Sequence, residues 1–137
     1  MKYLGIDYGT KKIGIAVTDD DGMMAFPRGV VATAEGRRHL LSVIQSENIN
    51  AIVIGLSLDQ DGKENTVAQK AKKFAEILKK ETNLPIHFIN EGYTSIHSRI
   101  GKNKNDLIDR KIKKENEGIV DDKSAVLILE RFLANKK

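Results

Sequence analysis

Short apolar runs separated by polar turns fill the first third of the chain, and this pattern predicts β-strands. Residues 2–6 and 13–17 are two such runs, joined by six polar or glycine-containing positions. A link this short allows only an antiparallel hairpin. A third run, residues 23–32, follows three aspartates and a glycine that are typical of a tight turn. The chain is therefore expected to begin with a three-stranded antiparallel meander.

From Thr33 onward the apolar spacing becomes that of helices alternating with strands. Thr33 is the predicted N-cap of a helix that ends near Asn48, and residues 51–54 follow as a strand buried on both faces. A second helix, a strand at residues 84–89 and a final helix come next. This order predicts an α/β fold. Its mixed five-stranded sheet joins the antiparallel meander to two parallel strands, with helices on both faces.

The composition bounds the class of protein. A length of 137 residues predicts a single domain, residues 1–137. The chain has no cysteine, which fits a reducing compartment, and it has no signal-peptide pattern, so we expect a cytoplasmic protein with no membrane partner. A net charge of +4 favours polyanionic partners weakly. Neither a serine-hydrolase elbow nor a dinucleotide-binding glycine motif is present in its required context.

Two acidic residues are predicted to follow the carboxyl ends of strands. Asp7 comes directly after the first apolar run, close to Gly9 and Thr10, and Glu91 comes after the strand at residues 84–89. Ligands of open α/β sheets gather at these strand ends. The simpler alternatives are a turn aspartate and a surface glutamate that precedes a helix.

The first turn of the last helix offers a third acid, either Asp121 or Asp122. Capping of the helix N-terminus explains at least one of them, and helical periodicity slightly favours Asp122 as the inward residue without settling the choice. Carboxylates that converge repel one another unless a cation neutralises them, so such a cluster predicts Mg²⁺ or Mn²⁺. These ions activate water and stabilise the leaving oxygen of a phosphodiester, which indicates a metal-dependent phosphodiesterase.

A basic stretch lies between the predicted sheet and the last helix. Residues 99–114 contain seven basic and two acidic side chains. A solvated, mobile basic loop at about residues 101–118 is the default interpretation, and an arm that follows a nucleic-acid backbone is the sharper one. The candidate nucleic-acid contacts are Thr10, Lys11, Lys12, Arg99, Lys102, Lys104, Arg110 and Lys111.

Three segments together resemble one known family. Residues 4–16 (LGIDYGTKKIGIA), 54–62 (IGLSLDQDG) and 120–130 (VDDKSAVLILE) are similar to motifs of the YqgF (RuvX) family of Holliday junction resolvases, also regarded as nucleases that mature the 5′ end of 16S ribosomal RNA. The resemblance covers nearly the whole chain, although its first motif alone is shared with actin and sugar kinases. It implies an RNase H-like fold, with Asp7, Glu91 and Asp121 as the catalytic, metal-binding acids.

The chain departs from the family pattern around Glu91. Asn90 and Gly92 stand where the family has an acid and an arginine, and Ser57 replaces a proline. Loss of the arginine removes a phosphate contact or a group that orients Glu91. The expected function is a metal-dependent endonuclease acting on structured nucleic acid, with 5′-end maturation of the 16S ribosomal RNA precursor as its task.

Two alternatives belong to other classes. The first is a catalytically impaired nucleic-acid-binding module of the same fold. The second is an actin-like ATP-binding domain, which would need two such halves where this chain has one. The sequence leaves open RNA or branched DNA as substrate, one or two metal ions, and a monomer or a weak homodimer.

Overall fold

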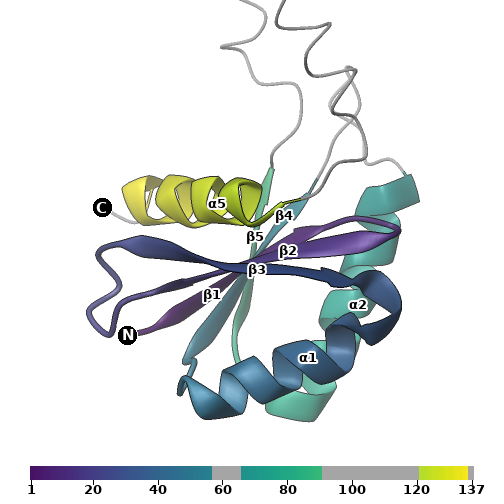
Figure 1. Cartoon of the computed structure of the whole chain (residues 1–137), viewed down its shortest axis with the longest axis horizontal. Helices are drawn as coiled ribbons and strands as arrows, with labels where there is room; N and C mark the ends of the chain where they lie inside the picture. Colours follow the sequence, from purple (N-terminus) through teal and green to yellow (C-terminus); the bar gives the residue numbers. More distant parts are fainter. Residues whose placement is uncertain (57–65, 91–120, 136–137) are drawn as a thin grey trace, which may run out of the picture.

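The structure is built on a mixed five-stranded sheet, shown in Figure 1. The computed structural model describes residues 1–56, 66–90 and 121–135. The elements are β1 (Tyr3–Tyr8), β2 (Lys12–Thr18), β3 (Ala25–Ala32), α1 (Thr33–Ser46), β4 (Ala51–Leu56), α2 (Thr66–Thr82), β5 (Ile86–Asn90) and α5 (Asp122–Asn135). The strand order is β3-β2-β1-β4-β5. The pairs β1–β2 and β2–β3 are antiparallel and the pairs β1–β4 and β4–β5 are parallel, which confirms the predicted fold.

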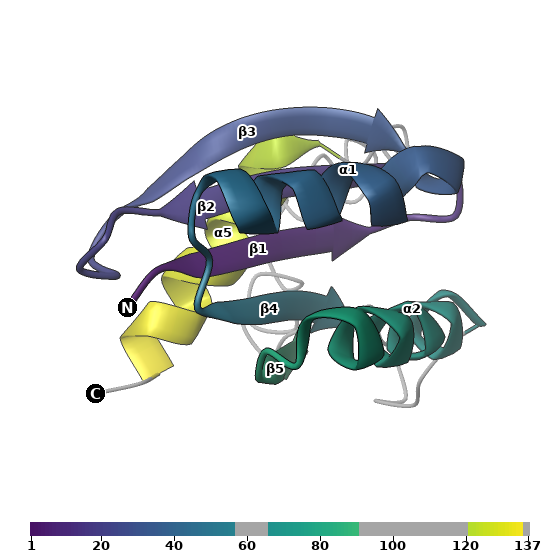
Figure 2. The same ribbon diagram turned by 90° about the horizontal axis from the view of Figure 1, so that it is seen from below.

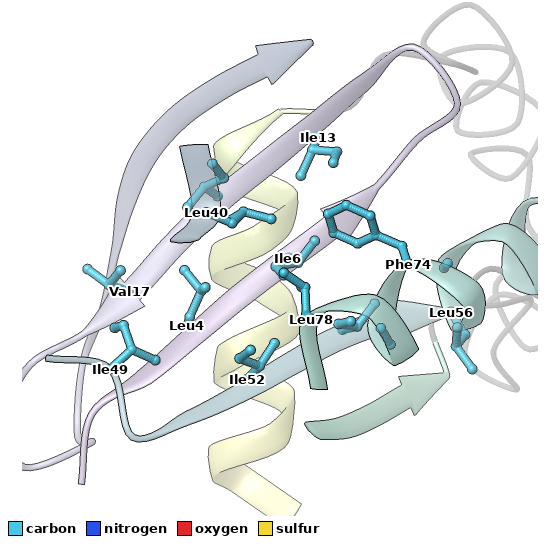
Figure 3. Packing of buried hydrophobic residues seen from close by; sticks show 14 of the residues in the cluster. Leu4, Ile6, Ile13, Val17, Leu40, Ile49, Ile52, Leu56, Phe74 and Leu78 are labelled. Carbon is cyan, nitrogen blue, oxygen red and sulfur yellow. The ribbon is translucent and has the colours of Figure 1, made fainter. Parts of the chain in front are cut away.

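Helices cover both faces of this sheet. Helices α1 and α2 lie on one face and α5 lies on the other (Figures 1 and 2). Side chains along a strand alternate between the faces, so Leu4 and Ile6 of β1 enter the core under α1 and α2, while Tyr3 packs under α5. Figure 3 shows the larger core, which includes Leu4, Ile6, Ile13, Val17, Leu40, Ile52, Phe74 and Leu78. In the described part of the chain, no helix is long and apolar enough to span a membrane.

Two glycines of the sheet, Gly5 and Gly14, allow α5 and the residue before it to pack directly against the strands. A Cβ atom added at Gly5 would lie 2.5 Å from Cγ of Leu129. One added at Gly14 would lie 2.0 Å from the backbone oxygen of Asp121, just before the helix begins. Ala125, Ile128 and Leu129 are fully buried in this contact. The distance between α5 and the sheet therefore depends on the absence of side chains at Gly5 and Gly14.

All five strands differ from their predicted bounds by one or two residues at one or both ends, and for two of them the structure shows the local cause. Asp7 lies inside β1 and not after it, because the ladder with β2 continues to the pair Tyr8 and Ile13. Strand β3 begins at Ala25 and not at Met23. The backbone N–H groups of Met23 and Met24 donate to Oδ1 of Asp19, at 2.7 and 3.3 Å, and close the turn before the strand begins.

The predicted role of Thr33 as an N-cap is also wrong. Ala32 holds the N-cap position without a side-chain hydrogen bond, and Thr33 is the first residue of α1. The Thr33 hydroxyl donates instead to the carbonyl of Gly9 at 2.7 Å, and its N–H donates to the carbonyl of Lys11 at 2.9 Å. Thr33 thus fastens the start of α1 to the β1–β2 turn.

Candidate active site

Asp7 lies near the carboxyl end of β1, the central strand of the sheet. It alternates with Leu4 and Ile6 in orientation and so lies on the α5 face. Its register partners are Gly14 on β2 and Gly55 on β4. Gly55 places no side chain beside the half-buried carboxylate, and the backbone of Asp121 fills the side-chain position of Gly14.

The start of α5 brings Asp121 and Ser124 to this position. Oδ1 of Asp121 accepts a hydrogen bond from the backbone N–H of Ser124 at 2.8 Å, which is the usual geometry of an N-cap. The side chain of Ser124 hydrogen-bonds to Asp7. Ser124 therefore connects both carboxylates, one through its backbone and the other through its hydroxyl. Sequence analysis missed this residue, and the available signal was its place three positions after a capping acid.

Burial dominates the electrostatics of Asp7. Removal of the carboxyl group from water raises its pKa from 3.8 to about 6. The hydrogen bond from Ser124 opposes this shift by stabilising the charged form, and the negative charge of Asp121 adds to it. Asp7 and Asp121 are thus close enough to repel each other when both are ionised.

The side chain of the neighbouring acid, Asp122, contacts β3 and not Asp7. Its Oδ2 accepts a hydrogen bond at 3.1 Å from the backbone N–H of Gly29 on β3, which has a φ of 98°. Asp122 therefore anchors the start of α5 to the edge strand, while Asp121 interacts with Asp7. Helical periodicity could not distinguish these roles, because Asp121 precedes the first helical residue.

The remaining predicted site residues divide into two groups. Thr10, Lys11 and Lys12 are exposed at the β1–β2 turn that follows Asp7, with Lys12 as the first residue of β2. The others lie outside the described residues, as does the predicted basic loop at residues 101–118; they are Glu91, Arg99, Lys102, Lys104, Arg110 and Lys111. Within residues 1–56, 66–90 and 121–135, no group of three or more histidine or acidic side chains is placed to hold a metal ion.

The two carboxylates nevertheless have the chemistry of a partial cation site. Hard divalent cations bind carboxylate oxygens, and a cation would offset both the burial of Asp7 and its repulsion by Asp121. Gly55, the register partner of Asp7 on β4, places no side chain beside the carboxylate. The residues present therefore fit Mg²⁺ or Mn²⁺.

Comparison with solved structures assigns this arrangement of strands and helices to the RNase H-like fold. The chain is similar to Thermus thermophilus RuvC in complex with a Holliday junction substrate, with a TM-score of 0.58 and 20% identity over 99% of this chain and 96% of that chain. It is also similar to the fowlpox virus Holliday junction resolvase, with a TM-score of 0.52 and 13% identity over the full length of both chains. At such identities the likeness establishes the fold alone.

Sequence comparison then establishes the family. The model of the RuvX family, described as Holliday junction resolvase, matches residues 1–135, and the chain belongs to this family. A protein of Oleidesulfovibrio alaskensis is 39% identical over 136 residues, covering 97% of this chain and 92% of its own. One from Nitratidesulfovibrio vulgaris (strain DSM 19637 / Miyazaki F) is 40% identical over 137 residues, covering 97% and 93%. Both are named "Putative pre-16S rRNA nuclease". The resemblance found in the sequence is confirmed.

Proposed function

We propose that this RuvX protein is a divalent-metal-dependent endonuclease that matures the 5′ end of the 16S ribosomal RNA precursor. Membership of the family and the names of the relatives support hydrolysis of nucleic-acid phosphodiesters. The observation that carries the proposal is the carboxylate pair of Asp7 and Asp121, joined through Ser124 beside two glycines. Domain extent, cytoplasmic location and a monomeric or weakly dimeric state stay predictions from the sequence.

The proposed metal ligands are Asp7, Asp121 and Glu91. Strands β1, β4 and β5 are parallel, so their carboxyl ends share one edge of the sheet, and Glu91 is the residue after β5 in the sequence. A bound Mg²⁺ or Mn²⁺ supplies Lewis-acid stabilisation of the phosphodiester and a water of lowered pKa. The chain itself contributes orientation, because the bonds made by Ser124 hold Asp7 and Asp121 in one arrangement.

Positive groups beside the acids are proposed to hold the substrate backbone. Lys11 and Lys12 are exposed next to the strand end that carries Asp7, and Thr10 offers a hydroxyl. Cations near the scissile bond attract phosphates and make binding depend on salt. Arg99, Lys102, Lys104, Arg110 and Lys111 are proposed contacts on the basis of charge alone.

Cleavage assays with isosteric variants test this proposal. Labelled 16S precursor RNA and a four-way DNA junction are incubated with the wild type, Asp7→Asn or Asp121→Asn, in Mn²⁺, Mg²⁺ or EDTA. We expect the wild type to cut the RNA only with metal and both variants to lose cleavage while they still bind. Asp122→Asn is the matched control, because an asparagine oxygen can still accept the bond from Gly29.

The outcome separates the alternatives. Cutting of the junction alone would replace the RNA by branched DNA as substrate. If the wild type binds both nucleic acids and cuts neither, the protein is a binding module, and the changes at Asn90 and Gly92 explain the loss of catalysis. Equal cleavage by the wild type and the Asp7→Asn variant would refute the site.

A further inference from the structure

A basic and partly apolar groove lies between α2 and the edge strand β5, away from the acids. Its volume is about 550 Å³, a size found in clefts that bind ligands. Its apolar lining consists of Ala75, Ile86 and Phe88, and its basic lining consists of Lys72, Lys79 and Lys80.

The apolar part of the groove exists because α2 does not cover β5 completely. The buried residues Ala75 and Leu78 of α2 belong to the core that contains Ile52 and Ile54 of β4. Phe88 pairs with Ile54 and so points to the α2 face, but it lies one strand further out. It keeps 44% of its surface exposed, an unusual fraction for a phenylalanine on a sheet.

The charge of the groove limits what can occupy it. Three lysines and one acid, Glu76, line it, so an anionic partner is favoured. Inorganic phosphate would use the lysines but would leave the ring of Phe88 without a function. Single-stranded nucleic acid uses both, because lysines follow the phosphates and an exposed aromatic ring stacks on a base.

The position of the groove connects it with the site. Asp7, Gly55 and Ile89 are register partners across β1, β4 and β5, and Phe88 immediately precedes Ile89. Two strand spacings separate β1 from β5, about 10 Å. Phe88 faces α2 whereas Asp7 faces α5, so a nucleic-acid strand that contacts both must pass round the carboxyl ends of β4 and β5 from one face of the sheet to the other.

We propose that the groove between α2 and β5 binds a single-stranded segment that flanks the scissile phosphodiester of the substrate. The inference rests on the proposed function and adds a specificity: substrates with a single-stranded flank are bound more tightly and cut faster than substrates that end at the duplex. Phe88 supplies the stacking surface, and Lys79 and Lys80 supply the phosphate contacts.

Binding of a fluorescein-labelled single-stranded RNA, followed by anisotropy in EDTA at several salt concentrations, tests the groove without catalysis. We expect Phe88→Ala and Phe88→Leu each to weaken binding about tenfold, because both remove the ring. Lys79→Glu should weaken binding and flatten its salt dependence. Lys70→Glu is the matched control, since nine helical residues turn it to the opposite side of α2 from Lys79. Thermal unfolding checks that each variant is folded.

A second assay compares cleavage of two substrates that share one cleavage site and differ only in the single-stranded flank. The wild type should prefer the flanked substrate, Phe88→Leu should lose that preference, and Lys70→Glu should keep it. Unchanged binding and preference in the Phe88 and Lys79 variants would overturn the inference, as would equal losses in Lys70→Glu. So would a wild-type dimer that Phe88→Ala dissociates, since the groove would then bind a second copy. Failure of the proposed function is distinct, because the wild type would then cut neither substrate.

Discussion

Replacing Asp7 by asparagine is expected to stabilise the folded protein above pH 6, besides abolishing cleavage. Burial, with the charge of Asp121, raises the pKa of Asp7 from 3.8 to about 6, so the folded chain holds this proton more tightly than the unfolded chain does. Protonated Asp7 therefore contributes to the free energy of unfolding. This contribution is fully present below pH 3.8 and is lost as the pH rises through 6. At about 1.4 kcal/mol per pKa unit the shift corresponds to about 3 kcal/mol, an upper bound because water screens a half-buried carboxylate. Asparagine carries no charge and avoids this loss.

Urea unfolding of the wild type and the Asp7→Asn variant between pH 4 and pH 8, with EDTA present, measures the effect. The difference in unfolding free energy should grow with pH in favour of the variant, by about 1–3 kcal/mol at pH 8. Asp19 also titrates in the acid range, because backbone N–H groups, first that of Met23, lower its pKa. It is present in both proteins, so its contribution cancels in the difference.

A difference that stays constant with pH would refute the reasoning, because the charge on Asp7 would then have no cost in the folded state. Adding Mn²⁺ gives an independent check. A cation bound at Asp7 stabilises the ionised carboxylate, so the wild type should gain stability at pH 8 and the variant should gain much less. Equal gains would place any bound metal elsewhere.

Three further substitutions test the geometry around this acid. In Gly14→Ala the new Cβ would lie 2.0 Å from the backbone oxygen of Asp121, so the start of α5 must move. We expect cleavage to fall about 100-fold and the unfolding free energy to fall by about 1–3 kcal/mol, and a wild-type rate would contradict this. Ser124→Ala should raise the pKa of Asp7 further and weaken Mn²⁺ binding in calorimetry, with Ser124→Thr as the control that keeps the hydroxyl. Unchanged Mn²⁺ affinity would show that the hydroxyl does not position the acid. Thr33→Val should lower the unfolding free energy by about 1 kcal/mol in urea, whereas Thr33→Ser should retain it.

The sheet was predictable because connection lengths restrict strand direction. Short turns force β1, β2 and β3 to be antiparallel, and helices between strands allow β4 and β5 to be parallel. Strand ends were less predictable, because local hydrogen bonds decide them. Met23 is apolar and continues the strand pattern, yet its N–H bonds to Asp19 and its side chain is 75% exposed. Pattern alone cannot detect such competition between a turn and a ladder.

Some residues of the site could also be recognised from the sequence, and others could not. Asp7 was recognisable from its place after an apolar run, since that place depends only on the local sequence. The relation of Asp121 to Asp7 depends on how close α5 lies to the sheet, which Gly14 sets from a distant part of the chain. Ser124 could not be singled out, because a serine in a first helical turn is ordinary until its partner in another element is known. The role of Glu91 stays a prediction.

The two acids of the carboxylate pair, Asp7 and Asp121, are far apart in the sequence, and this affects when the pair can form during synthesis. Asp7 is translated early, whereas Asp121 and Ser124 are added after all five strands. The residues of the sheet are therefore synthesised before the helix that covers Asp7. Until α5 docks, Asp7 has neither the hydrogen bond from Ser124 nor Asp121 beside it. A nascent chain that ends before Asp121 therefore lacks the carboxylate pair, and the proposed metal site can form only after α5 has been made.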